Sequence, residues 1–338
     1  MVIIQLAGGL GNQMFQYALY LQLKSLGKDV KIDDVSGFVE DRQRDPALKP
    51  FGVDYERATK KELRRMLDSS PFLHAKIRRK LCGREKKSYF EEDKRYRPEI
   101  MEWDDIYLEG YWQTEKYFRA VSGQVRKAYD TDRLLSYIEE TDAEETEEKK
   151  NKNPEQSTLR EWLDRITQTE SVSVHIRRGD YLLPQNQELF GNICTEAYYA
   201  AAMEQMRREH PGCVFYLFTN DKDWAEKEIN SKCYENAGDG EEAFGIGGNG
   251  QIQIVNLEEK AWSGMDRDYA EFILMSRCRH NIMANSSFSW WASYLNRNPN
   301  KTVLAPEKWL NGWNCEDLYR EDMRKIRAAA AAGQKRQE

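Results

Sequence analysis

The chain has 338 residues, of which 40% are hydrophobic, 12% aromatic and 32% charged, and its formal net charge is −6. These proportions are typical of a globular protein and exclude a disordered or fibrous chain. The negative charge argues against a general nucleic-acid binder, because affinity for a phosphate backbone needs clustered Lys and Arg. The sequence contains no apolar run near 18 residues, so we expect no segment to span a bilayer.

The amino-terminal part predicts one β-α-β unit. Val2–Ala7 has the composition of a buried strand and lacks the charged region of a signal peptide, from which we expect a cytoplasmic protein. Gln13–Leu26 has the apolar periodicity of a helix that Gly27 ends in the usual position after the last turn. A strand follows at Val30–Ile32, and another is expected at Ile106–Trp112.

The region between residues 60 and 99 is basic, with 14 Lys or Arg against 7 Asp or Glu. Four of its cations, Lys76, Arg78, Arg79 and Lys80, fall on an expected helix. The favoured interpretation is a solvated face. The alternative is a basic patch, within 60–97, that rests against anionic lipid at the inner membrane face or against an anionic acceptor.

The stretch Glu139–Gln156 is crowded with Glu and Lys and has no apolar anchor, as in a solvated linker or a helix-loop insertion. A chain of this length is expected to form two domains, and we place their boundary in this stretch. The predicted domains are residues 1–155 and 156–325, followed by a tail at 326–338 that should fray.

Beyond this boundary, strands alternate with helices, which predicts a parallel, doubly wound α/β sheet. The expected strands are Val172–Ile176, Val214–Thr219, Ile252–Val255, Asn281–Ala284 and Thr302–Leu304, and the expected helices are Thr195–His210, Asp223–Ile229, Asp266–Cys278 and Ser287–Leu295. Glu235–Gly250 carries six glycines and is predicted to be a mobile loop.

The strand that ends at Ile176 delivers charged residues at its carboxyl end, where open α/β sheets bind ligands. Arg177 and Arg178 can hold a diphosphate bidentately, and Gly179 permits a tight turn. Asp180 is expected to fix one arginine or to cap the turn. Surface ion pairs are the less favoured alternative, because a strand end inside a sheet is a costly place for unpaired cations.

A glycine-rich segment, Gly8–Gln13, follows the first strand and opens the first helix, where backbone N–H groups favour an anion. A dinucleotide fingerprint G-x-G-x-x-G would start at Gly9, but its third glycine position is Met14, which is too bulky. Asp33 lies where the acid of an NAD site would lie. An NAD-dependent oxidoreductase therefore stays as an alternative.

Polar turns also follow two other expected strands, at Asn220-Asp221 and at Asn285–Trp291. The second is either an ordinary helix cap or a phosphate-binding turn, and its Trp pair is expected in the core. The pairs Asp221-Lys-Asp223 and Asp266-Arg-Asp268 imitate the Asp-x-Asp of metal-dependent glycosyltransferases. Because both fall where helices start, we prefer a capping role and expect no metal.

Only one histidine, His175, falls in this predicted site. The other three, His74, His210 and His280, are expected to be ordinary surface or helix-end residues.

Four motifs together resemble the bacterial α-1,2-fucosyltransferase family: Gly8–Tyr17, Gly110–Phe118, His175–Tyr181 and Asn285–Trp291. The resemblance spans nearly the whole chain. It implies a GT-B architecture, in which two Rossmann-like lobes face each other across a cleft and the C-terminal lobe holds most of the GDP. It also implies inverting, metal-free transfer of L-fucose from GDP-β-L-fucose to the 2-hydroxyl of a terminal β-galactose on an oligosaccharide or lipid-linked glycan.

The resemblance assigns roles to single residues. Arg177 is similar to an arginine that engages the β-phosphate, with Arg178 and Asp180 as its supports. Apart from the resemblance, His175 or Asp180 is the expected proton acceptor, because each could approach the hydroxyl from the strand end. The residues expected at the donor are Gly9, Gly11, Asn12, Gln13, Arg178, Asn220, Asp221, Asn285, Ser286, Ser287 and Phe288. Among these, Asn220 and Asp221 are the expected contacts to the guanosine. GDP-fucose is the expected co-substrate, with no further cofactor. A non-catalytic glycan-binding protein remains an alternative.

Overall fold

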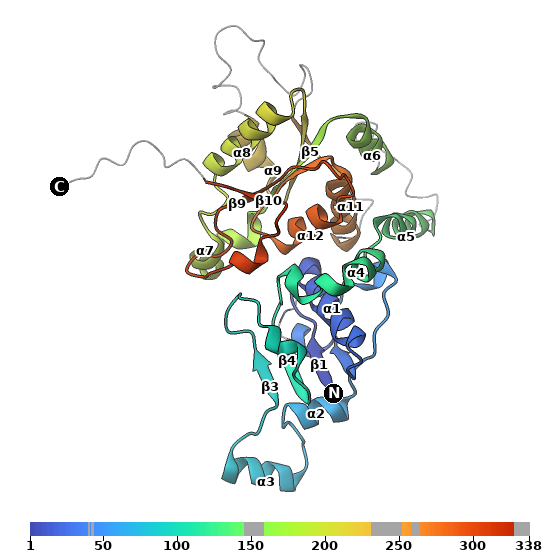
Figure 1. The fold of residues 1–338 in the computed structure, drawn as a ribbon, viewed down its shortest axis with the longest axis vertical. Helices are drawn as coiled ribbons and strands as arrows, with labels where there is room; N and C mark the ends of the chain where they lie inside the picture. Colours follow the sequence, from blue (N-terminus) through green and yellow to red (C-terminus); the bar gives the residue numbers. More distant parts are fainter. Residues whose placement is uncertain (40, 42–43, 145–158, 231–251, 258–263, 328–338) are drawn as a thin grey trace, which may run out of the picture. The chain divides into compact units, whose positions relative to one another are not determined.

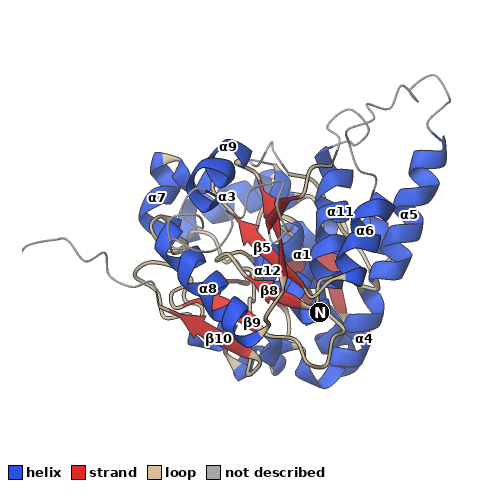
Figure 2. Ribbon diagram, turned by 90° about the horizontal axis from the view of Figure 1, so that it is seen from above, coloured by secondary structure: helices blue, strands red, loops and turns tan. Residues whose placement is uncertain are grey.

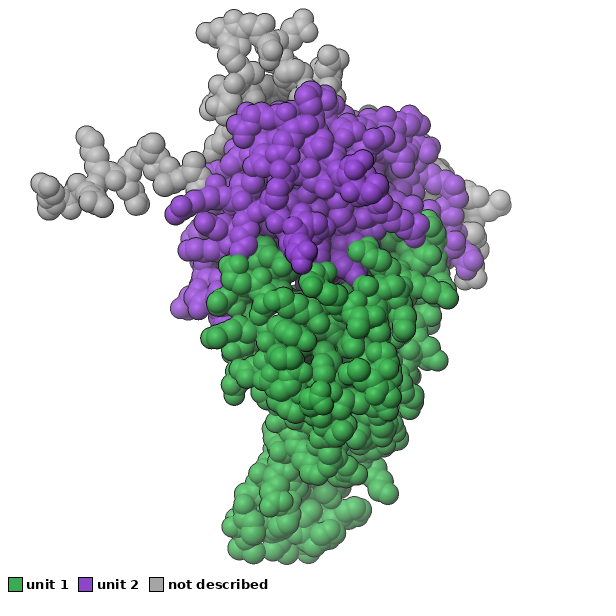
Figure 3. Space-filling model, viewed as in Figure 1, with its two compact units in different colours: residues 1–133, 314–319 green, residues 134–313, 320–338 purple. Residues whose placement is uncertain are grey.

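The computed structural model describes residues 1–338 except 40, 42–43, 145–158, 231–251, 258–263 and 328–338. The chain forms two compact units, which Figure 3 colours separately. Unit 1 comprises Met1–Arg133 and Asn314–Tyr319, and unit 2 comprises Leu134–Trp313 and Arg320–Glu338. The predicted boundary near 155, the glycine-rich loop and residues 328–338 of the predicted tail lie outside the described residues. The predicted start of the tail was wrong, because Ile326 is buried as the last residue of a strand, Met323–Ile326.

Unit 1 is built on a parallel sheet with the order β2-β1-β4-β3. Its strands are β1 (Val2–Gln5), β2 (Val30–Asp33), β3 (Ser88–Phe90) and β4 (Ile106–Glu109), and its helices include α1 (Leu10–Ser25), α2 (Lys60–Met66), α3 (Leu73–Cys82) and α4 (Ser122–Ala128). The chain passes from β1 to β2 on one side and later returns to β4 on the other. The strand order therefore reverses between β1 and β4, the two neighbouring strands labelled in Figure 1.

Helix α1 starts earlier than its periodicity predicts. It begins at Leu10, with Gly9 as an extended N-cap, so Gly11, Asn12 and Gln13 are helical rather than part of a glycine-rich turn. Apolar periodicity gives no signal for this first turn, because two of its first three residues are Gly and Asn.

The carboxyl end of α1 confirms the role predicted for Gly27. This residue has φ +76°. Its N–H donates to the carbonyl of Lys24 at 2.9 Å, and the N–H of Lys28 donates to that of Leu23 at 3.3 Å. These two bonds form a Schellman motif, which needs a residue at positive φ.

Unit 2 contains a parallel sheet of six strands with the order β7-β6-β5-β8-β9-β10. Its strands are β5 (Ser171–Ile176), β6 (Val214–Thr219), β7 (Ile252–Ile254), β8 (His280–Ile282), β9 (Val303–Pro306) and β10 (Met323–Ile326), and its helices include α6 (Leu159–Gln168), α7 (Pro184–Phe190), α8 (Glu196–Glu209), α9 (Lys222–Trp224), α11 (Gly264–Arg277) and α12 (Ser287–Leu295). The chain builds outward from β5 to β7, then returns to β8 and builds the other way. This is a doubly wound sheet with its switch point between β5 and β8.

Both faces of this sheet are covered by helices, as Figure 2 shows with strands in red and helices in blue. Alternate residues of β5 divide between the faces. Val172, Val174 and Ile176 belong to the core cluster that includes Met203 of α8. His175 points to the opposite face, where its ring contacts Phe288 of α12. The strand therefore brings His175 to α12 and continues into the arginine pair.

The predicted α/β class and parallel sheets are confirmed, and two elements have the predicted bounds, β6 and α12. The expected helix at Asp223–Ile229 is instead the short α9 followed by a π-helix at Ala225–Asn230. Part of the expected linker is helical, because α5 runs over Thr131–Glu144. In the part of the chain that the structure describes, no helix is long and apolar enough to cross a membrane. The predicted cleft between two lobes stays a prediction.

Candidate active site

The turn after β5 places two arginines at the carboxyl edge of the unit 2 sheet, beside its switch point. The Arg177 guanidinium forms an ion pair with Asp180, with 3.0 Å between Nη2 and Oδ1. The Arg178 guanidinium lies 3.0 Å from Oδ2 of Asp221, which follows β6. Both arginine side chains stay partly exposed. The prediction that Asp180 fixes one of the arginines is confirmed.

Gly179 allows this turn to approach the next strand end closely. Its φ is +23°, and an added Cβ would lie 2.3 Å from Nδ2 of Asn220. The Asn220 amide is not free to move aside, because its Oδ1 accepts the N–H of Arg178 at 3.0 Å. A side chain at position 179 would therefore break the contact between the two strand ends.

Asn220 and Asp221, predicted as guanosine contacts, hold Arg178 in this structure. Asp221 also accepts the N–H of Trp224 at 3.1 Å, so the predicted capping role is confirmed for this acid. The Arg178 guanidinium lies over the Trp224 ring, 4.1 Å from its centroid. Arg178 is thus fixed by three contacts from the segment after β6, and the guanosine contact stays a prediction.

His175 is buried next to the arginines. Burial and the nearby charge of Arg177 lower the pKa of His175 from 6.5 to about 3. Its ring centroid is 5.6 Å from that of Phe288, and its Nδ1 has no hydrogen-bond partner among the described residues. The imidazole is therefore neutral at physiological pH and is a weak base.

The turn after β8 begins with two buried residues. The Asn285 amide donates to the carbonyl of Trp309 at 3.1 Å, and Ser286 caps α12 by accepting the N–H of Phe288. Ser287 and Phe288 are only half-buried. The capping alternative therefore holds for Ser286, while Ser287 and Phe288 reach the surface beside His175. The Trp pair, Trp290 and Trp291, is fully buried as predicted.

Two acids on α11, Asp268 and Glu271, have raised pKa values, and nearby arginines oppose both rises. Burial raises the pKa of Glu271 to about 7, although Arg267 Nε lies 3.0 Å from its carboxylate and opposes the rise. Partial desolvation raises the pKa of Asp268, and the charge of Arg177 opposes that rise. Glu271 is not among the site residues predicted from the sequence. Its spacing of four residues from Arg267 is the available signal, because side chains four apart meet on a helix.

In unit 1, the Gln13 side chain is fully buried, which contradicts its predicted contact with the donor. Its amide nitrogen donates to the carbonyls of Gly8 and Asp45 at 2.9 and 3.0 Å. Its oxygen accepts the N–H of Ala47 at 2.7 Å. Gln13 therefore ties the start of α1 to the segment around residue 46.

Asn12 and Gly9 are half-buried at the carboxyl end of β1, while Gly11 is buried. The Asn12 Oδ1 accepts from Nε2 of Gln113, which follows β4, at 2.7 Å. Gly8, at φ +72°, leaves room for this arrangement, because an added Cβ would lie 2.6 Å from the Asn12 amide. Asn12 thus lies where the strand order of the unit 1 sheet reverses. Its contact with the donor GDP-fucose stays a prediction.

Asp33, the acid expected in an NAD site, already accepts hydrogen bonds from other residues of unit 1. Asp33 is buried, its Oδ1 accepts the N–H groups of Val35 and Ser36, and its Oδ2 accepts the Tyr107 hydroxyl at 2.8 Å. Met14, at the third glycine position of the fingerprint, is also buried. This geometry argues against dinucleotide binding.

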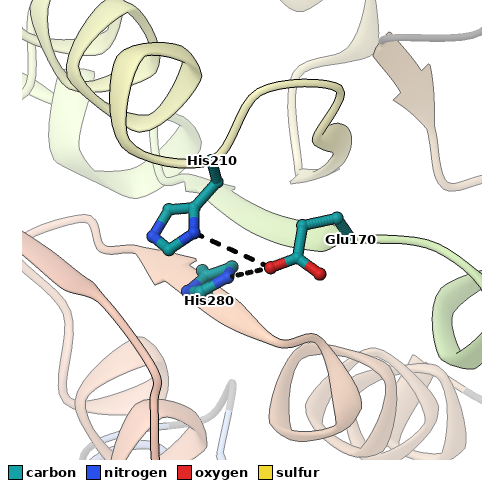
Figure 4. Close-up of side chains that lie close together, drawn as sticks. All are labelled: Glu170, His210 and His280. Carbon is teal, nitrogen blue, oxygen red and sulfur yellow. Dashed lines mark hydrogen bonds and ion pairs between the residues drawn. The ribbon is translucent and has the colours of Figure 1, made fainter.

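Glu170, His210 and His280 form a cluster at the amino end of β5 and β8, shown in Figure 4. The expectation of a surface or helix-end residue was wrong for His280, which is buried. Its Nδ1 accepts the N–H of Thr302 at 2.9 Å, and its Nε2 lies 2.8 Å from Glu170 Oε1.

An accepting Nδ1 places the neutral-state proton of His280 on Nε2, which faces the carboxylate. In this tautomer Nε2 has no lone pair for a metal. The cluster therefore suits a structural hydrogen bond better than a metal centre. It also lies at the end of the sheet opposite the arginine pair.

The fold and the arginine edge define a class of protein, an open doubly wound α/β protein with paired arginines beside the topological switch point of a sheet, where such folds bind their ligands. Residues 1–326 match glycosyl transferase family 11. The chain belongs to this family and is a glycosyltransferase. The family match leaves the oxidoreductase alternative without support.

Individual relatives agree with the family. The chain is 28% identical over 328 residues to an alpha-1,2-colitosyltransferase of Escherichia coli, covering 91% of this chain and 92% of the relative. It is 33% identical over 124 residues to galactoside alpha-(1,2)-fucosyltransferase 1 of Saimiri boliviensis boliviensis, covering 37% and 28%. Among solved structures it is similar to NodZ alpha-1,6-fucosyltransferase soaked with GDP-fucose, with a TM-score of 0.42, 14% identity, and coverage of 87% and 92%.

Proposed function

We propose that the chain transfers L-fucose from GDP-β-L-fucose to the 2-hydroxyl of a terminal β-galactose, with inversion to an α-1,2 linkage. The observation that carries the proposal is the partly exposed Arg177 beside the switch point of the unit 2 sheet. Crevices at this position bind nucleotides in doubly wound sheets. Two relatives support the linkage, because both are alpha-1,2-transferases.

Arg177 is proposed to bind the β-phosphate and to stabilise the charge that develops as the bond between fucose and GDP breaks. GDP leaves with the bonding electron pair, the galactose oxygen attacks the anomeric carbon, and the hydroxyl proton passes to an acceptor. A preorganised donor of this kind is often the largest single contribution to catalysis. Two arginines supply the positive charge at this edge, so we propose that transfer needs no metal.

Asp180 is the proposed proton acceptor. Of the two candidates, His175 is buried and its pKa is lowered to about 3, so it accepts a proton poorly at neutral pH. The Asp180 carboxylate keeps solvent contact and is paired with Arg177. When Arg177 turns toward a phosphate, its ion pair with Asp180 opens, and the carboxylate is proposed to accept the proton of the galactose hydroxyl.

The donor sugar has one specific rival, colitose, because the colitosyltransferase relative matches over most of the chain. The experiment that separates the two uses purified protein with GDP-fucose or GDP-colitose and a panel of β-galactosides. NMR of the product gives the new linkage. Fucose in an α-1,2 linkage supports the proposal, whereas exclusive use of GDP-colitose overturns the fucose assignment.

The role of Arg177 is tested by substitution. Arg177→Ala should lower kcat at least ~100-fold, the effect of removing one donor to developing charge. Arg324→Ala is the matched control, because it removes an exposed arginine of β10 in unit 2. This arginine forms an ion pair with Glu209 of α8. Asp180→Asn should lower kcat while GDP still raises the melting temperature by mass action.

Four results would count against these assignments. Unchanged turnover in Arg177→Ala would contradict the catalytic role of this arginine. Loss of transfer in EDTA would contradict the metal-free mechanism. Stabilisation by GDP without transfer to any galactoside would favour the glycan-binding alternative. A retained kcat in Asp180→Asn would place the proton acceptor elsewhere.

A further inference from the structure

Helix α3 of unit 1 leaves an apolar row in solvent. Leu73, Ile77 and Leu81 are 72%, 51% and 78% exposed, and the neighbouring Phe72 is 63% exposed. The three helical residues are four apart, so they share one face. Large apolar side chains are common at protein surfaces when they are scattered, but a contiguous row marks an interaction surface.

The opposite face of α3 is attached to the segment that leads into the helix, between α2 and α3. Ala75 is buried, and the guanidinium groups of Arg78 and Arg79 contact Asp68. Arg79 also donates to the carbonyl of Ser70 at 2.6 Å. These contacts use the face of α3 opposite the apolar row, and the row itself stays exposed. Figure 1 shows α3 at the end of unit 1, beyond α2.

Cations without protein partners surround the row. Lys76, Lys80, Arg84 and Lys86 are exposed, and none forms an ion pair within the described parts of the chain. On a helix, Lys76 and Lys80 lie along one border of the row formed by residues 73, 77 and 81. This local excess of positive charge stands against the net charge of −6 for the whole chain.

We propose that α3 docks unit 1 onto a bilayer that contains anionic lipids. The apolar row enters the boundary between head groups and acyl chains, and the lysines bind the anionic head groups while their alkyl stems lie along the apolar layer. The unpaired cations favour this partner over a second copy of the chain, whose net charge is negative but whose α3 carries the same positive charge. Docking does not depend on the proposed transfer reaction, so the two are tested separately.

The test is co-sedimentation of the full chain with phosphatidylcholine vesicles, prepared with and without phosphatidylglycerol. We expect binding to the anionic vesicles only, weakening as salt is raised. Leu73→Ser/Ile77→Ser/Leu81→Ser should lower the partition coefficient at least ~10-fold, because buried methylene groups provide much of the affinity. Lys76→Glu/Lys80→Glu should lower it by a similar factor, about fivefold for each charge lost.

Lys60→Glu/Lys61→Glu is the matched control, since it makes the same charge change at exposed positions of α2. This variant should retain most of the binding. Equal losses in both lysine variants, or no loss in the serine variant, would overturn docking through α3. A change of sedimentation coefficient in the serine variant without vesicles would identify the row as a self-association surface instead. The melting temperature of each variant checks that the fold is intact. We expect it to be unchanged, because every substituted side chain is exposed.

Discussion

Gly179→Ala is the sharpest test of the arginine turn, because one methyl group meets one identified atom. The added Cβ would lie 2.3 Å from Asn220 Nδ2. Relief requires the amide to rotate away, which breaks its hydrogen bond with the N–H of Arg178. The residue must also hold φ at +23°, where a side chain is strained.

These effects set the expected magnitude. Strain at positive φ costs about 1–2 kcal/mol for a non-glycine residue, and the lost hydrogen bond contributes about 1 kcal/mol. Gly179→Ala should therefore lower the free energy of unfolding by roughly 2–3 kcal/mol. At about 2–4 °C for each kcal/mol in a unit of this size, the melting temperature should fall by roughly 5–10 °C.

Gly212→Ala separates strain from steric overlap. Gly212 has φ +79°, and no atom lies within 4 Å of its added Cβ, so only the strain remains. Both variants should lose stability in urea unfolding, but only Gly179→Ala should weaken GDP binding measured by calorimetry. The partner is then checked with Gly179→Ala/Asn220→Ala, which removes the overlapping amide.

The double variant decides the outcome. If the overlap is with Asn220, the two substitutions are non-additive, with a coupling free energy of about 1 kcal/mol, within the range seen for residues in contact. Additive losses, or equal GDP affinity in Gly179→Ala and Gly212→Ala, would refute the proposed contact between the two strand ends.

The other two predictions concern pH. Because the pKa of His175 falls from 6.5 to about 3 on folding, only the unfolded chain binds this proton between those values, and stability falls as pH drops below 6.5. His175→Gln should flatten urea-measured stability against pH by up to ~1.4 kcal/mol per pH unit, and an unchanged slope would contradict the buried neutral imidazole. For Glu271, the pKa is raised from 4.5 to about 7, so the folded state keeps a proton that the unfolded state loses and stability falls as pH rises through this window. Glu271→Gln should match wild type near pH 5 and be more stable near pH 8, by on the order of 3 kcal/mol at most; an equal melting-temperature difference at both pH values would count against this.

The arginine edge could be predicted because its signals are local. The strand before Arg177 alternates and then stops at charged residues, and Asp180 is close enough in sequence to pair with Arg177. Capping by Asp221 and Ser286 is likewise a property of short segments. The same is true of the glycine that ends α1.

Non-local contacts could not be predicted. Glu170, His210 and His280 are far apart in the sequence and meet only because β5, β6 and β8 are neighbours in the sheet. The strand β10, Met-Arg-Lys-Ile, has two exposed charged residues at its centre, and β3, Ser-Tyr-Phe, has no buried residue, so neither has the apolar run that marked the other strands. Gln13 is polar, which is typical of a residue that contacts a ligand. Only the fold shows that its side-chain amide is hydrogen-bonded to the backbone of Gly8, Asp45 and Ala47.

The contacts of the two arginines divide their roles. Arg178 is held by Asn220, Asp221 and the Trp224 ring, all from the segment after β6, so moving it would disrupt several contacts at once. Arg177 forms an ion pair with Asp180, three residues away and partly exposed, and such pairs contribute only about 0–1 kcal/mol. Exchanging that carboxylate for a phosphate therefore requires little free energy. Arg178 fixes the turn in place, and this leaves Arg177 as the arginine that can follow charge as it develops on a leaving diphosphate.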